Sequence, residues 1–204
     1  MKKREFIIIF LSLIALIISF LFDDIIISFI KISRNGVLNG LFIFFGYFLD
    51  PIIIFFLVIA LFLLYEKKRK WILPIGLTII ISSIFSLFLK IIIKRPRPFQ
   101  EQDLQVLKAL FYFIQDNFNK WNFSFPSYSS VFVFSILPFI NKEFNKFRYI
   151  WIVIASLVAL SGTYFGESYL SDTIGGALIG YLIGYSILKT EEKYQLTEKI
   201  YKIR

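Results

Sequence analysis

Three short groups of polar residues interrupt a strongly apolar sequence, and the first group, residues 90–98, contains Lys90 and Arg97. Both follow a long apolar run, and Pro96 and Pro98 stiffen the chain around Arg97. An ammonium group offers a point charge and a guanidinium group offers a planar fork of donors, a pairing that suits phosphate oxygens. The alternative is that Lys90 extends its charge toward water and that the arginines are ordinary flanking residues. By itself, the first group predicts either an anion site or the end of a helix.

The second group, residues 125–130, stands at the start of another apolar run and contains three serines. Hydroxyl groups and free backbone N–H groups at the beginning of a helix form a natural site for an anion. Serine is also a favoured N-cap residue, so the alternative is that Ser127 only caps the helix.

The third group, residues 161–172, joins two apolar runs and ends in Asp172, which could cap the helix that follows. Ser168 lies four residues before Asp172, and the two side chains would share a face if the turn between them were helical. A serine hydroxyl needs a neighbouring base to act as a nucleophile. Asp172 is the nearest candidate in the sequence, although a carboxylate with an ordinary pKa of about 4 is a weak base at neutral pH.

The composition excludes several mechanisms that such groups would otherwise suggest. The chain has 204 residues, with no histidine and no cysteine. A Ser-His-Asp triad, a phosphohistidine intermediate, an imidazole or thiolate metal site and a disulfide are therefore impossible. A site for a hard cation is disfavoured, because Glu167 and Asp172 are the only carboxylates in the three groups. We expect neither a metal nor an organic cofactor.

The apolar runs between the groups must supply the helices that position them. Hydrophobic residues make up 57% of the chain and charged residues 18%, whereas a soluble domain is typically about 45–50% apolar and about 25% charged. We expect one all-α domain over 1–204, a polytopic membrane helix bundle with about six transmembrane helices. The first run ends in Phe22-Asp23-Asp24 without a small-residue cleavage site, which indicates a retained membrane anchor. The expected spans are 6–22, 41–65 (interrupted at Asp50-Pro51), 71–93, 123–140, 149–165 and 173–188.

The distribution of Lys and Arg indicates how the spans are oriented. Of the 23 basic residues, 15 fall at the two termini and in the loops after the second and fourth spans, and eight fall on the opposite side. We therefore expect a multi-pass cell-membrane protein with both termini in the cytoplasm and the three polar groups outside. Four of those eight charges lie in the first group, which indicates an anionic partner there. Nucleic acid is disfavoured as that partner, because the basic group is short and embedded in the membrane.

Two further patterns concern packing. Gly176, Gly180 and Gly184 form a stripe with one-turn spacing, which is typical of close contact between membrane helices, and we assign it no function. Between residues 104 and 121, apolar residues recur at alternating intervals of three and four, which predicts an amphipathic helix in the loop between spans three and four. This helix could cover a site at the membrane surface or simply pack on the bundle.

Together, the three groups resemble the motifs of the type-2 phosphatidic acid phosphatases, also called the lipid phosphate phosphatase or vanadium haloperoxidase superfamily. The pattern of that family is K-x6-R-P, then P-S-G-H, then S-R-x5-H-x3-D. The first motif is complete here between Lys90 and Pro98. The second motif is Pro126-Ser127-Tyr128-Ser129, with tyrosine for glycine and serine for histidine.

The third motif keeps Ser161 and Asp172 at the family spacing, but it has Gly162 for arginine and Ser168 for histidine. The six-span layout, the outward motif loops and the glycine-rich last helix are also similar to the membrane members of the family. The resemblance thus covers nearly the whole chain and implies a membrane protein that acts on phosphorylated lipids.

The resemblance also implies a role for each position. In the family, the third-motif histidine attacks phosphorus, the aspartate orients it, and the second-motif histidine protonates the leaving oxygen. The equivalent positions here are Ser168, Asp172 and Ser129. The lysine, the two arginines and the serine of the family hold the phosphoryl oxygens. The equivalent phosphate-binding residues that remain here are Lys90, Arg97 and Ser127.

Three functions are open at this point. The preferred hypothesis is a catalytically degenerate protein that binds lipid phosphate or diphosphate headgroups, because loss of a general acid alone typically lowers a rate by about 10²–10⁴. The second is an active phosphatase on phosphatidic acid or polyprenyl diphosphate that uses Ser168, Glu167 or Asp172. The third is a structural or partner-binding membrane protein that inherited the motifs.

Overall fold

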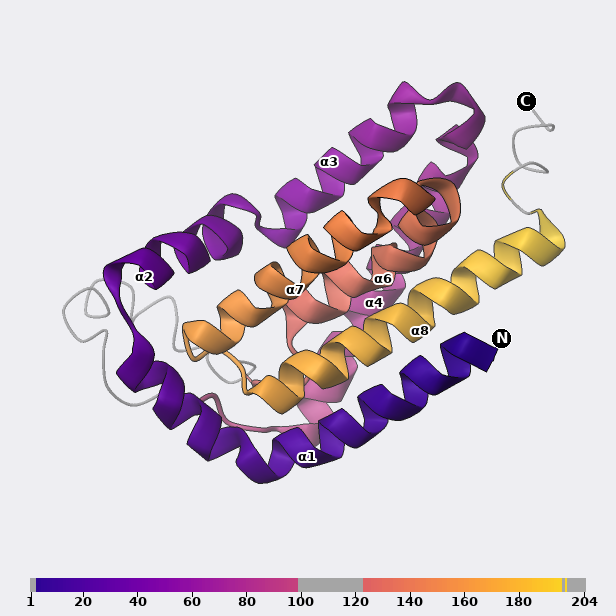
Figure 1. Cartoon of the computed structure of the whole chain (residues 1–204). Coiled ribbons are helices and arrows are strands. Elements are labelled where there is room, and N and C mark those ends of the chain that lie inside the picture. The colour runs from indigo at the N-terminus through magenta and orange to yellow at the C-terminus, as the bar shows by residue number, and fades with distance from the viewer. Residues whose placement is uncertain (1–2, 99–122, 196, 198–204) are drawn as a thin grey trace, which may run out of the picture.

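The structure is a computed structural model that describes residues 3–98, 123–195 and 197, and these residues form helices and turns without a strand (Figure 1). The predicted all-α fold is confirmed. The long helices are α1 (Lys3–Ser33), α2 (Gly36–Ile43), α3 (Pro51–Leu64), α4 (Ile72–Ile93), α6 (Tyr128–Glu143), α7 (Arg148–Tyr164) and α8 (Leu170–Tyr194). Short helical turns cover Phe44–Phe48, Glu66–Trp71 and Asn145–Phe147. The predicted amphipathic helix over 104–121 lies outside the described residues.

Three stretches of the described chain are long and apolar enough to cross a membrane: Phe10–Ser33, Glu66–Ile93 and Asn145–Tyr164. A fourth candidate is a bent pair, in which the helices of Gly36–Gly46 and Pro51–Leu64 meet at 58°. The bend follows from the sequence, because the Asp50 side chain accepts a hydrogen bond from Ile52 N at 2.8 Å and Pro51 begins the next helix. The predicted spans 71–93 and 149–165 thus correspond to α4 and α7, and the predicted span 41–65 corresponds to this bent pair.

Helix α1 differs from its prediction, since the expected span ended at Phe22 and the helix continues to Ser33. Asp23 does not end the helix, because its side chain is buried and paired within the bundle. Asp24 is exposed, and apolar residues resume at Ile25. A single paired carboxylate is therefore accommodated inside a long membrane helix.

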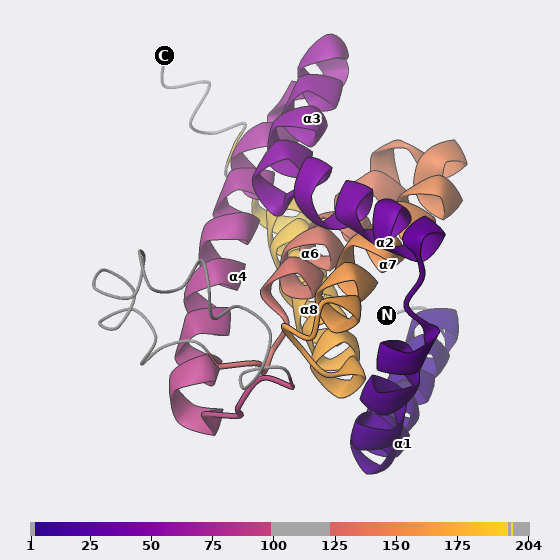
Figure 2. The same ribbon diagram turned by 90° about the vertical axis from the view of Figure 1, so that its left-hand side faces the viewer.

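The two remaining predicted spans fall on α6 and α8, which are not among the described stretches that are long and apolar enough to cross a membrane. The two helices pack against each other within the bundle (Figures 1 and 2). The glycine stripe of α8 makes this contact possible: a Cβ at Gly180 would overlap the carbonyl of Val131, and one at Gly184 would overlap that of Ser135. At the other end of the stripe, a Cβ at Gly176 would lie 2.7 Å from the Ser127 carbonyl oxygen. The stripe is therefore a packing surface, and it holds the start of α8 against the start of α6.

Chain direction then brings the three polar groups to one end of the bundle. Lys90 lies in the last turn of α4, the second group begins α6, and the third group connects α7 to α8. The end of α4 and the segments that lead into α6 and α8 lie at the lower end of the bundle in Figure 2. The opposite ends of these helices form the other face of the molecule.

Candidate functional site

Two backbone hydrogen bonds join the three polar groups. Ser124 N donates to the Arg95 carbonyl at 2.8 Å, which ties the segment before α6 to the first group. Ser127 N donates to the Asp172 carbonyl at 3.1 Å, which ties the second group to the third. Segments that lie up to about 80 positions apart in the sequence are therefore held together at this end of the bundle.

Lys90 is buried at this site, with 8% of its surface exposed. Its Nζ donates to the carbonyl of Phe123 at 2.6 Å and to that of Ser124 at 3.4 Å. The Lys90 charge is also within electrostatic range of the Arg97 cation and of the Asp172 and Glu167 carboxylates. An ammonium has three N–H donors, and described residues accept from two of those of Lys90. The third N–H is available for a ligand as far as the described residues are concerned.

Arg97 lies just beyond α4 and is half-buried. Burial lowers the pKa of its guanidinium, and attraction to the Glu167 carboxylate opposes that shift. Arg97 Nε is buried, and no other described residue accepts a hydrogen bond from it. A buried donor without an acceptor loses about 1–3 kcal/mol of hydration, so an oxygen-rich ligand would be stabilised here.

Gly162 lies at the centre of a set of side-chain oxygens. A Cβ at this position would lie 3.3 Å from Ser168 Oγ and 4.0 Å from both Ser127 Oγ and Glu167 Oε2. Ser127 occupies the N-cap position of α6, yet its side chain makes no capping hydrogen bond. The capping alternative for Ser127 is therefore not observed, and its hydroxyl faces the third group.

Two other residues of the second motif lie nearby. Ser129, in the first turn of α6, is partly buried. Tyr128 is 40% exposed, and its hydroxyl oxygen lies 3.3 Å from Ser83 Oγ on α4. The tyrosine that replaces the family glycine therefore lies along α4, away from the oxygens around Gly162.

Asp172 is fully buried, and each of its carboxylate oxygens already has a donor. Tyr169 N donates to Oδ2 at 2.8 Å, so Asp172 caps the start of α8, and Arg95 Nη1 donates to Oδ1 at 2.6 Å. Ser168 precedes the helix, because Tyr169 is extended with ψ 165°. The Ser168 hydroxyl instead lies 3.4 Å from Thr173 Oγ1. The condition for Ser168 and Asp172 to share a helix face is therefore not met.

Arg95 forms an ion pair with Asp172 that the sequence did not reveal. The same guanidinium also binds Asp23 of α1. Arg95 Nη2 lies 2.7 Å from Asp23 Oδ2, and Ser171 N donates to Asp23 Oδ1 at 3.1 Å. The Arg95 guanidinium also lies 4.0 Å from the centroid of the Tyr169 ring. The position of Asp23 inside an apolar run was the available signal, because ionisable residues within membrane helices usually have a specific partner.

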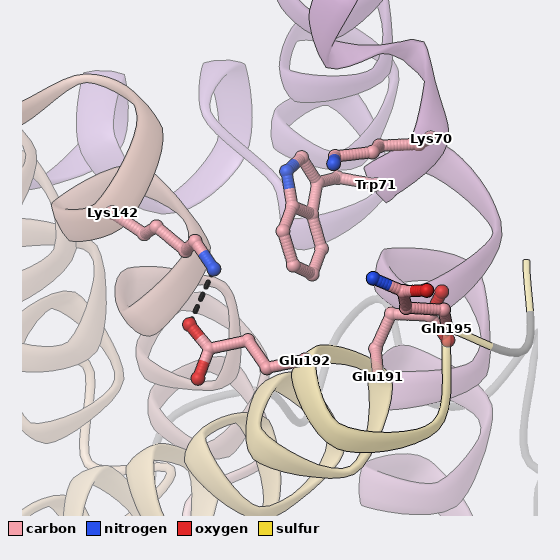
Figure 3. Close-up of a pocket in the computed structure, with 6 residues that line it drawn as sticks. All are labelled: Lys70, Trp71, Lys142, Glu191, Glu192 and Gln195. Atoms are coloured by element: carbon pink, nitrogen blue, oxygen red, sulfur yellow. Dashed lines mark hydrogen bonds and ion pairs between the residues drawn. The ribbon is translucent and has the colours of Figure 1, made fainter. Parts of the chain in front are cut away.

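A separate pocket of about 190 Å³ lies at the opposite ends of α4, α6 and α8 (Figure 3). Helix α4 has 22 residues and is therefore about 33 Å long, which separates this pocket from the polar groups. An ion pair between Lys142 and Glu192 crosses the pocket, as the dashed line in Figure 3 shows. The lining residues are Lys70, Trp71, Lys142, Glu191, Glu192 and Gln195. None of them belongs to the three polar groups.

Comparisons of the sequence and of the fold with known proteins identify the family of this chain. No curated protein matches the chain. The fold is similar to the crystal structure of the first transmembrane PAP2 type phosphatidylglycerolphosphate phosphatase from Bacillus subtilis, with a TM-score of 0.60 and 22% sequence identity. The similarity covers 92% of this chain and 96% of that chain. The model of the PAP2 superfamily matches residues 71–195, more than half of the chain and all three polar groups. The predicted resemblance is thus confirmed, and this membrane protein belongs to the PAP2 superfamily.

Proposed function

We propose that this protein binds the phosphate or diphosphate headgroup of a membrane lipid at the extracytoplasmic face and does not hydrolyse it. The observation that carries the proposal is the contrast between the two halves of the site. Serine stands at both positions where the family has histidine, Ser129 and Ser168. The phosphate-binding residues Lys90, Arg97 and Ser127 are retained and lie at the same end of the bundle.

The environment of Ser168 supports the loss of catalysis. A serine nucleophile needs a base within hydrogen-bond reach, and among the described residues the side chain that shares a hydrogen bond with the Ser168 hydroxyl is Thr173, another hydroxyl. Asp172 directs its two oxygens to Arg95 and to the backbone of Tyr169. Removing the general acid typically lowers a rate by about 10²–10⁴, which corresponds to about 3–5 kcal/mol, before the loss of the nucleophile is counted.

The remaining donors support phosphate binding. Among the described residues, Lys90 has one N–H without an acceptor and Arg97 has a buried Nε without one. Ser127 has a hydroxyl that does not cap its helix. Ionised donors make stronger hydrogen bonds to phosphate oxygens than neutral donors do. The excess of Lys and Arg on the opposite side supports an extracytoplasmic site and cytoplasmic termini.

Lipid binding by purified protein in detergent micelles tests this proposal. We expect saturable binding of phosphatidic acid or polyprenyl diphosphate, and at least about tenfold weaker binding by Arg97→Gln, since a hydrogen bond to a charged group contributes about 1.5–3 kcal/mol. Lys146→Ala is the matched control, because Lys146 is an exposed cation on the loop between α6 and α7. The proposal is wrong if wild-type protein shows no saturable binding, or if Arg97→Gln binds as wild type does while both variants retain the wild-type melting temperature.

A further inference from the structure

Positive charge is in excess at the end of the bundle opposite the polar groups. The described segments at that end are the turn before α4, the connection between α6 and α7, and the last turns of α8. They contain nine Lys or Arg residues and four glutamates: Lys67, Lys68, Arg69, Lys70, Lys142, Lys146, Arg148, Lys189 and Lys193, with Glu66, Glu143, Glu191 and Glu192. Basic residues that only orient a membrane protein need no particular arrangement. Here, two of the lysines line one pocket between three helices, and that arrangement requires a further explanation.

Lys70, Trp71 and Lys142 form the cationic wall of this pocket (Figure 3). Lys142 Nζ lies 4.5 Å from the centroid of the Trp71 ring, and Lys70 Nζ lies 5.7 Å from it. The Trp71 side chain is buried, and its Nε1 donates to Glu143 Oε1 at 2.9 Å, so the ring has a fixed position. Two ammonium groups from different helices are therefore held near one indole ring, beside a pocket of about 190 Å³.

The carboxylates of the pocket do not neutralise this wall. Glu192 Oε1 accepts from Lys142, and Glu192 Oε2 accepts from Lys189 Nζ at 2.6 Å, so one carboxylate is shared by two ammonium groups. Glu191 Oε1 accepts from the backbone N–H of Thr197 at 2.9 Å. Both ion pairs of Glu192 are partly exposed, and exposed ion pairs are weak. A ligand phosphate can therefore bind Lys142 while Lys189 keeps its contact with Glu192.

An apolar strip leads from the pocket along the outside of α4. Leu73 and Leu77 follow Lys70 at helical intervals, and both are exposed. Ile80 and Ile84 continue the strip and are also exposed. Since α4 is long and apolar enough to cross a membrane, this strip faces the acyl chains of lipids. A ligand with a charged end and hydrocarbon chains matches the pocket and the strip together, whereas a soluble phosphate matches the pocket alone.

We propose that this pocket binds the phosphodiester headgroup of an anionic phospholipid from the leaflet opposite the polar groups. The phosphate contacts Lys70 and Lys142, and the acyl chains lie along the apolar strip of α4. Basic pockets between membrane helices are typical sites for anionic headgroups. A zwitterionic headgroup is disfavoured, because it would bring its own ammonium close to the two lysines. This inference is independent of the proposed function, since it concerns the other end of the bundle.

Native mass spectrometry of the full chain, released from detergent micelles, tests the proposal with two lipids. Dioleoyl phosphatidylethanol is anionic, and dioleoyl phosphatidylcholine has the same chains and phosphodiester but adds a trimethylammonium group. Diethyl phosphate is the soluble competitor without acyl chains. Lys142→Gln removes one cation of the wall. Lys146→Gln is its matched control, because Lys146 is an exposed lysine at the same end that does not line the pocket.

We expect wild-type protein and Lys146→Gln to bind phosphatidylethanol about fivefold more tightly than phosphatidylcholine. Lys142→Gln should weaken phosphatidylethanol binding by about fivefold, since one basic residue near an anionic surface contributes about 1 kcal/mol. Glu192→Gln should strengthen it by about 2- to 5-fold, because the charge that competes with the phosphate for Lys142 is removed. This gain is an independent test, since damage to the fold would not strengthen binding. Arg97→Gln should bind phosphatidylethanol as wild type does, which separates this site from the polar groups.

Several results would overturn the proposal. Equal binding of the two lipids by wild-type protein would show that the charge of the headgroup is not recognised. Equal losses in Lys142→Gln and Lys146→Gln would show that only the general surface charge matters. Weaker binding by Glu192→Gln would contradict the competition for Lys142. Displacement of the lipid by an equal concentration of diethyl phosphate would identify a soluble phosphodiester as the ligand, and loss of binding in Arg97→Gln would place the lipid at the polar groups.

Discussion

Replacing Asp23 with asparagine tests the contact that fixes α1 to the polar end of the bundle. Asp23 accepts hydrogen bonds from Arg95 Nη2 at 2.7 Å, from Ser171 N at 3.1 Å and from Ser171 Oγ. Asparagine keeps the size of the side chain and one acceptor oxygen, but it removes the charge that Arg95 faces. A hydrogen bond between charged groups contributes about 1.5–3 kcal/mol, so we expect Asp23→Asn to lower the free energy of unfolding by about 2–3 kcal/mol. Arg95 keeps its second ion pair with Asp172, so the loss stays below the roughly 3–5 kcal/mol of a buried charge left alone.

Unfolding of the purified protein in mixed micelles, followed by tryptophan fluorescence, measures this change. The expected loss corresponds to a folding equilibrium about 30- to 150-fold less favourable. Asp24→Asn is the matched control, because the neighbouring side chain is exposed and its substitution should stay within about 0.5 kcal/mol. Equal stability of the two variants would refute the assignment of Arg95 and Asp23 as a buried ion pair.

Three further predictions follow from other contacts. Gly180→Ala places a methyl group against the Val131 carbonyl and should destabilise the protein by about 1–3 kcal/mol. Gly76→Ala is the control and should not destabilise it, because no atom lies within 4 Å of the Cβ position of Gly76. Thermal unfolding that ranks the two variants in the reverse order would contradict the packing. Ser129→His combined with Ser168→His should not release phosphate from phosphatidic acid, because Gly162 still stands where the family has a phosphate-binding arginine, and turnover by this double variant would show that the missing arginine is dispensable. Tyr128→Phe should leave lipid binding unchanged, because the hydroxyl faces Ser83 on α4, and a change of more than about threefold would place it in the site.

Features that depend on local sequence were predictable. The apolar runs that became α4 and α7 are continuous and long enough to span a membrane, so their positions follow from composition and length. The glycine stripe was equally clear, because its one-turn spacing reports on a close helix contact whatever the partner helix is. The break at Asp50-Pro51 combined a capping side chain with a residue that begins helices, and the structure bends there.

Features that depend on a distant partner were not predictable. An acidic residue after an apolar run is typical of the end of a span, so Asp23 was expected to end one. The partner that keeps Asp23 inside the helix is Arg95, which lies 72 positions away in the sequence. Asp172 looked like a potential base for Ser168, but the extended backbone at Tyr169 and the hydrogen bond from Arg95 direct its oxygens elsewhere. The placement of Glu167 beside Gly162 likewise depends on how the connection between α7 and α8 folds back.

Phosphate release and lipid binding, measured on one preparation of wild-type protein, test the central claim most directly. We predict saturable binding of a phosphorylated lipid together with phosphate release no greater than that of Ser168→Ala. Release of phosphate by wild-type protein that Ser168→Ala abolishes would contradict the account and identify an active phosphatase without histidine.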